Sequence, residues 1–107
     1  MPVVDIAYNN AEVDTADVKA LAEAIHVVVV KAAGIEDVPV YATKADVIVE
    51  AAPVEIFIRI SKQKIIDREA LVNAIRKGIS AWKKRAAFTH KVNFTLIPMD
   101  WDISIEE

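Results

Sequence analysis

Apolar and polar positions alternate along the chain with two different periods, which predict strands and helices in turn. Residues 54–60 alternate strictly, with valine or isoleucine at every second position, as in a strand buried on one face. Three further segments rich in β-branched and aromatic residues also predict strands: 2–8, 38–43 and 92–97. Two short strands are expected as well, 47–49 after a turn at 44–46, and 103–105.

Two other segments follow the 3.6-residue period of a helix. The first begins at Asp14, whose side chain can accept from free backbone donors of the first turn, and ends at Gly34, which favours the left-handed conformation. The second begins at Asp67 and runs to about residue 86. Hydrophobic pairs expected to flank the two helix starts are Val13 with Val18, and Ile66 with Leu71.

The first helix carries more apolar residues than one buried face requires. The positions expected to face the core are Val18, Leu21, Ala22, Ile25, Val28, Val29 and Ala32. A narrow polar stripe contains Lys19, Glu23 and His26. Outside both lie four more apolar residues, Ala20, Ala24, Val27 and Val30. This surplus is covered either by the chain itself or by another subunit.

The elements follow the order β-α-β-β-α-β, which is a doubled unit. Pro2 and Pro53 each precede a valine that opens a strand, at an offset of 51, and Asp14 and Asp67 open the helices at an offset of 53. Because a helical crossover joins parallel neighbours, each half is expected to form a parallel β-α-β unit. The prediction is an α+β fold with a four-stranded mixed sheet and both helices on one face. A ferredoxin-like sandwich is the alternative. Residues 1–107 are expected to form a single domain, with pseudo-repeats of about 1–50 and 53–105.

Composition narrows the possible functions. The net charge of −3 argues against binding nucleic acid or a membrane surface. The absence of cysteine excludes disulfides, thiolate metal sites and cysteine nucleophiles, and His26 and His90 lack partners at metal-ligand spacing, so neither a metal nor a cofactor is expected. No segment approaches the ~20 apolar residues needed to cross a bilayer, and no signal peptide pattern is visible. The expected location is cytoplasmic.

Pro2 is the candidate for chemistry. Removal of Met1 would leave the proline nitrogen as a secondary amine, whereas retention of Met1 makes it an amide without basicity. A free α-amine has a pKa of about 7.7–8.0, which burial and nearby cations lower. The resulting neutral base can take a proton from a carbon beside a carbonyl and return it elsewhere, which is keto–enol tautomerisation. The purely structural interpretation is that Pro2 begins an edge strand, where its missing N–H is tolerated.

The Met-Pro start leading into a strand, the two halves of about fifty residues and the second Pro-Val at Pro53 together resemble the tautomerase superfamily. That superfamily includes macrophage migration inhibitory factor, oxalocrotonate tautomerase and carboxymethyl-hydroxymuconate isomerase. Residues 53–56 and 93–98 look most like its short bacterial members. Only Pro2 matches a motif residue by residue. The lysine that inhibitory-factor-like members carry after the first helix corresponds to Ile35 or Glu36 here, which is a departure from their pattern.

The resemblance implies a homotrimer with sheets around a central axis and helices outside. The pocket would surround the amino-terminal proline near a subunit boundary and take a small-molecule carboxylate. A trimer would also account for the surplus apolar surface of the first helix.

Such chemistry needs a cation for the carboxylate and an electrophile for the enolate. Arg59 is the first candidate, because the strand alternation directs it away from Val54, Ile56 and Ile58. If the halves superpose, that face also bears Pro2, Val4 and Ile6, and Asp5 then falls on the helix-covered face. A pairing of Arg59 with Glu55 is the plainer alternative. The other candidates for substrate binding are Lys62, Tyr41 and Trp101, with Tyr8 as a further aromatic that is equally typical of a core.

The leading hypothesis is a tautomerase or isomerase for a carboxylate-bearing enol or 2-keto acid, with Pro2 as proton carrier and Arg59 as substrate clamp. The alternative is a non-catalytic oligomeric binding or scaffold module of the same or a ferredoxin-like fold.

Overall fold

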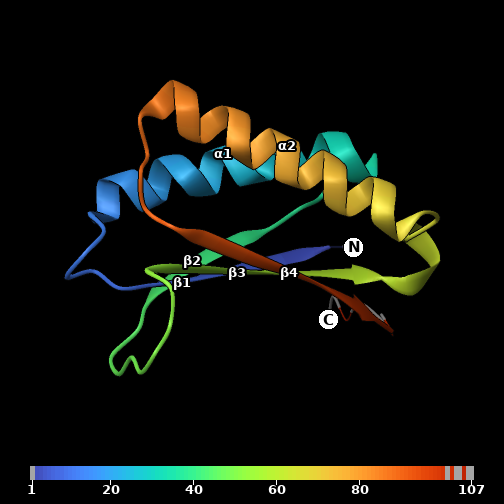
Figure 1. Cartoon of the computed structure of the whole chain (residues 1–107). Coiled ribbons are helices and arrows are strands. Elements are labelled where there is room, and N and C mark those ends of the chain that lie inside the picture. The colour runs from blue at the N-terminus through green and yellow to red at the C-terminus, as the bar shows by residue number, and fades with distance from the viewer. Residues whose placement is uncertain (1, 101, 103–104, 106–107) are drawn as a thin grey trace.

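A four-stranded sheet carries two helices on one face (Figure 1). The computed structural model describes residues 2–100, 102 and 105. The strands are β1 (Val3–Tyr8), β2 (Val40–Lys44), β3 (Val54–Ser61) and β4 (Val92–Met99). The helices are α1 (Thr15–Ala33) and α2 (Arg68–Ala86), with a 3₁₀ turn, η1 (Lys62–Lys64), between β3 and α2.

The sheet has the order β2-β1-β3-β4. Within each half the two strands are parallel neighbours, β1 with β2 and β3 with β4, and the halves meet through the antiparallel pair β1 and β3. The parallel pairing expected from the helical crossovers is therefore confirmed, as is the α+β fold. The ferredoxin-like alternative is wrong, because that fold splits the strands of a β-α-β unit.

The core lies between the helices and one face of the sheet. On β1 and β3 the buried residues alternate with half-buried ones, and the register places Val4 opposite Ile58 and Ile6 opposite Ile56. The helices contribute the buried residues Val18, Leu21, Ile25, Val29, Leu71, Ile75 and Ile79. The other face of the sheet, called the open face below, has no helix over it within the described residues.

Local capping follows the sequence closely. The side chain of Asp14 accepts from the backbone N–H of Ala16, and that of Asp67 accepts from the N–H of Ala70. Gly34 ends α1 with a φ of 68°, and its N–H donates to the carbonyl of Val30. These interactions satisfy groups that a helix terminus leaves without intrahelical partners.

The expected hydrophobic pair at the start of α2 is wrong. Ile66 is 97% exposed. The preceding residue, Ile65, packs against the core instead, because η1 turns the chain before α2 begins. The pair at the start of α1 behaves as expected, since both Val13 and Val18 are buried.

The short strand expected at 47–49 is also absent from the structure. β2 ends at Lys44, and the following segment is a loop with Val47 and Val49 largely exposed and Glu50 at a φ of 51°. The strand expected at 103–105 falls on a segment of which residues 103 and 104 lie outside the described part of the chain.

The surplus apolar surface of α1 is covered only in part: Val30 packs against the core and Ala24 is half-buried, whereas Ala20 is exposed. Val28 packs against α2 at Gly78, where an added Cβ would lie 2.8 Å from both Val28 methyl groups, so glycine permits the close approach of the helices. Val27, one residue earlier, remains 60% exposed. No helix of the described chain is both long and apolar enough to cross a membrane.

Candidate functional site

Pro2 is buried and directly precedes β1. Continuing the β1–β3 register by one residue places Pro2 opposite Ile60, a fully buried residue. The loop beside it is held by two hydrogen bonds: Val4 N–H donates to the carbonyl of Pro39 at 3.0 Å, and His26 Nδ1 donates to the carbonyl of Val38 at 2.9 Å. The amino terminus therefore lies at the end of the sheet where β3 and β4 finish (Figure 1).

Lys62 is placed at this same end of the sheet. It begins η1 immediately after β3, two residues beyond the position opposite Pro2. Its Nζ lies 3.5 Å from Asp100 Oδ2, and both side chains are largely exposed. An exposed pair at this separation contributes little stability, so the ammonium can exchange Asp100 for another carboxylate at small cost.

Arg59 projects from the opposite face to Pro2, which corrects the sequence-based expectation. It pairs with Val3 in the register and lies on the open face, whereas Val4 and Ile6 face the helices. The expectation rested on aligning Pro2 with Pro53, an odd offset of 51 residues. Because side chains in a strand alternate with a period of two, an odd offset exchanges the two faces.

The carboxylate that binds Arg59 is Asp5. Arg59 Nη1 donates to Asp5 Oδ2 at 2.5 Å, with both side chains about two-fifths exposed. Glu55, the partner expected from the sequence, accepts from Asn93 Nδ2 at 3.2 Å instead. Asp5 thus lies on the open face and not, as predicted, on the helix-covered face. The sequence analysis did not identify Asp5 as the partner of Arg59. The apolar residues Val4 and Ile6 on either side of Asp5 indicate that Asp5 points to the face opposite them.

The aromatic candidates are dispersed. Tyr41 is 59% exposed on the open face, opposite Asp5 in the register. Tyr8 is buried at the far end of β1 from Pro2, where its hydroxyl shares a hydrogen bond with Thr15 Oγ1 at 3.0 Å. Trp101 lies outside the described residues. The structure therefore groups Tyr41 with Arg59 and Asp5, and leaves Lys62 as the predicted cation at the Pro2 end.

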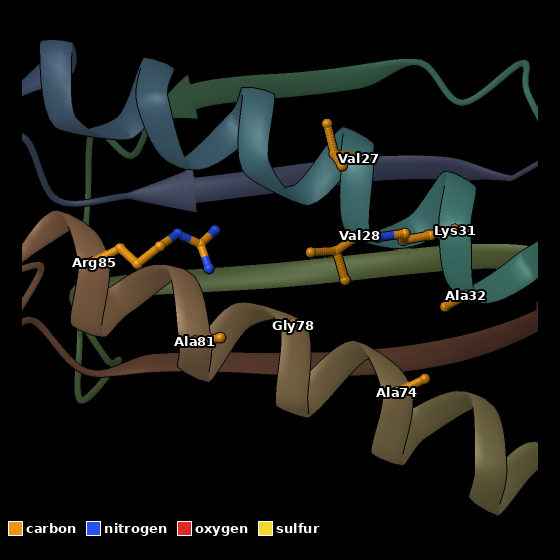
Figure 2. Close-up of a pocket in the computed structure, with 8 residues that line it drawn as sticks. All are labelled: Val27, Val28, Lys31, Ala32, Ala74, Gly78, Ala81 and Arg85. Atoms are coloured by element: carbon orange, nitrogen blue, oxygen red, sulfur yellow. The ribbon is translucent and has the colours of Figure 1, made fainter.

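A separate hollow of about 350 Å³ lies between the two helices (Figure 2). Its floor is the contact of Val28 with Gly78, and Lys31 and Arg85 line it. None of the predicted site residues contributes to this hollow. The described part of the chain contains no cluster of three or more histidine, aspartate or glutamate residues that could hold a metal ion.

No protein-family model and no curated protein matches the sequence. Solved structures do match the fold. Malonate semialdehyde decarboxylase superposes with a TM-score of 0.69 at 15% identity, covering 98% of this chain and 92% of that protein. For 5-carboxymethyl-2-hydroxymuconate delta-isomerase the TM-score is 0.64 at 12% identity, over 99% and 89% of the two chains. A macrophage migration inhibitory factor-like protein from Entamoeba histolytica gives 0.62 at 14% identity, over 96% and 95%.

These three proteins are members of the tautomerase superfamily, and nearly the whole of both chains takes part in each superposition. The chain therefore has the tautomerase fold.

Proposed function

We propose that this protein is a member of the tautomerase superfamily and that, once Met1 is removed, it acts as a tautomerase or isomerase on a small enol or 2-keto carboxylate. The observation that carries the proposal is the buried Pro2 at the start of β1, in a fold shared with an isomerase and a decarboxylase. Burial of a freed amine favours its neutral, basic form.

In the proposed reaction, the Pro2 nitrogen accepts a proton from a carbon beside the substrate carbonyl. The electron pair of the broken C–H bond passes into the enolate. The protonated amine then returns a proton to a different carbon or to the oxygen, so that Pro2 is regenerated and no other reactant is consumed. The role of Pro2 is general acid–base catalysis, which typically supplies a rate factor of about 10²–10⁴.

Lys62 is the preferred cation for the substrate carboxylate, in place of Arg59. Lys62 lies at the Pro2 end of the sheet and has an exposed partner, whereas Arg59 lies on the other face and already binds Asp5. We expect Lys62→Ala to raise KM for an enol carboxylate about tenfold with a smaller change in kcat, because a charge-assisted hydrogen bond to the bound substrate is lost. Lys64→Ala, in the same 3₁₀ turn, is the matched control and should change KM little. Equal effects of the two substitutions would contradict the role of Lys62.

The proposal includes a cytoplasmic homotrimer that completes the pocket with a neighbouring subunit. The open face supports this arrangement, because its half-buried Val3, Phe57 and Ile97 and its exposed Tyr41 offer apolar surface to another copy.

A non-catalytic binding module of the same fold is the second candidate. The observation in its favour is that Arg59, the arginine first expected to hold the substrate, is engaged by Asp5 at 2.5 Å.

The test compares two forms of the same chain, with Met1 removed and with Met1 retained, whose identities are established by intact mass. Only the form with a free Pro2 nitrogen is expected to catalyse ketonisation of a simple enol acid. The intact mass of the protein from its native cells then shows which form exists there. Equal rates for the two forms, or retention of Met1 in the native protein, would contradict the catalytic proposal and favour the binding module.

A further inference from the structure

Val38 lies beside Pro2 at the end of the sheet. Continuing the parallel register of β1 with β2 back by two residues from Val4 and Val40 places Val38 alongside Pro2, and Ile60 lies on the other side of Pro2. A step of two residues along a strand keeps the same face, so all three share the helix-covered face with Val4. Pro2 is buried, Val38 is 3% exposed and Ile60 is fully buried. Pro2 is therefore flanked on both sides by a buried aliphatic residue.

The segment that carries Val38 has few ties to the rest of the chain. Residues 35–39 lead from the end of α1 to β2 without forming a helix or strand (Figure 1), and Pro39 has no N–H to donate. Among the described residues, two hydrogen bonds hold this segment. Val4 N–H donates to the carbonyl of Pro39 at 3.0 Å, and His26 Nδ1 donates to the carbonyl of Val38 at 2.9 Å. The bond from His26 is the one that holds Val38 itself.

The partner of His26 decides which form of the ring makes this bond. A carbonyl oxygen only accepts, so Nδ1 must carry a proton, as it does in one neutral tautomer and in the protonated ring. His26 can therefore hold Val38 whether or not the ring is charged. His26 belongs to α1, 12 residues before Val38, and the bond thus ties the segment to a helix that packs on the core.

We infer that His26 is a positioning residue for the proposed reaction, which keeps Val38 beside Pro2 by holding the Val38 carbonyl. The inference rests on the proposed function of Pro2, but His26 acts through Val38 and needs no contact with the substrate. A displacement of about 1 Å at a reacting group can lower a rate by about 10²-fold. A bond that fixes the residue next to the amine therefore has a direct effect on the chemistry.

Loss of this bond should change the surroundings of the freed Pro2 amine. Residues 35–39 gain freedom, and water then reaches the amine more easily. Water favours the charged form, so the pKa of the amine should rise toward its ordinary value. The other titratable groups at this end are Glu36 and Asp37 of the segment, and Lys62 with its partner Asp100. These groups are the same in every variant compared below.

His26→Asn and His26→Leu form a matched pair that isolates the hydrogen bond. The asparagine Nδ2 is attached to the same side-chain position as the histidine Nδ1 and can donate to the Val38 carbonyl. Leucine has nearly the shape of asparagine but no donor, and neither side chain is charged. Lys19→Leu is the control for an apolar residue on the same polar stripe, two turns earlier, where Lys19 is exposed.

The kinetic test uses protein from which Met1 has been removed. We expect His26→Leu to lower kcat for ketonisation of an enol acid about tenfold with KM within about twofold, because the amine and not the substrate contact is disturbed. His26→Asn should restore kcat to within about threefold of the parent value, and Lys19→Leu should leave kcat unchanged. Circular dichroism and thermal unfolding show that each variant is folded.

Nuclear magnetic resonance tests the inference without a substrate. Titration of the Pro2 amine should give a higher pKa in His26→Leu than in the parent and in His26→Asn. Exchange of the Val4 amide proton, which donates to Pro39, should be about 2–10-fold faster in His26→Leu, since the net loss is that of one hydrogen bond.

Two outcomes would overturn the inference. One is a Pro2 pKa that is the same in His26→Leu and in the parent; the other is an effect of His26→Asn as large as that of His26→Leu. If the parent protein has no activity, the proposed function fails, and the titration of Pro2 still decides whether His26 holds Val38 beside it.

Discussion

Replacing Pro2 with alanine is expected to lower kcat/KM for ketonisation of an enol acid by about 10²-fold or more, in protein from which Met1 has been removed. The proline ring fixes the direction of the nitrogen lone pair at the start of β1, where the residue is buried. The alanine amine can rotate and is primary, so both its orientation and its basicity change. Steady-state rates with one substrate, measured on proteins of verified intact mass, provide the comparison.

Pro53→Ala is the matched control for this substitution. Pro53 precedes β3 as Pro2 precedes β1, but its nitrogen is an internal amide. Its carbonyl accepts from the backbone N–H of Asn9 at 3.0 Å, a bond that alanine can keep. We expect Pro53→Ala to change kcat/KM by less than about threefold, since neither a reacting group nor a charge is altered. If Pro2→Ala and Pro53→Ala have the same activity, Pro2 carries no proton and the catalytic proposal fails.

Ile56→Ala is expected to lower the free energy of unfolding by about 2–5 kcal/mol. Ile56 is fully buried on β3, opposite Ile6 of β1 and Phe94 of β4. Removing its side chain leaves a cavity between two neighbouring strands and the helix layer, which the surrounding backbone cannot close. For a domain of this size the melting temperature should fall by at least about 8 °C. Urea unfolding monitored by circular dichroism measures the free energy directly.

Ile66→Ala is the internal comparison for the core substitution, because it removes the same atoms from a residue that is 97% exposed. We expect its free energy of unfolding to remain within about 0.5 kcal/mol of the parent value. A loss at Ile66 as large as the loss at Ile56 would contradict the packing of Ile65, rather than Ile66, against the core.

The sequence by itself determined the two helices, the four main strands and their order. Strand and helix periods, helix caps and helix ends depend on side chains and hydrogen bonds within a few residues of one another. The caps at Asp14 and Asp67 and the end at Gly34 could therefore be predicted from the sequence. The helical crossovers then required parallel pairs within each half. From these local features the α+β sheet with both helices on one face could be predicted without coordinates.

The tertiary structure decided which residues share a face, and therefore which ones can form a site. Asp5 and Arg59 are 54 residues apart, and only the antiparallel register of β1 with β3 places them together on the open face. The alignment of the two halves at Pro2 and Pro53 was shifted by one residue, and it therefore predicted Arg59 on the face of Pro2. In the structure Arg59 lies on the opposite face of the sheet. Register depends on contacts between distant strands, and so the chain order alone left undetermined both the partner of Arg59 and the position of Lys62 at the Pro2 end of the sheet.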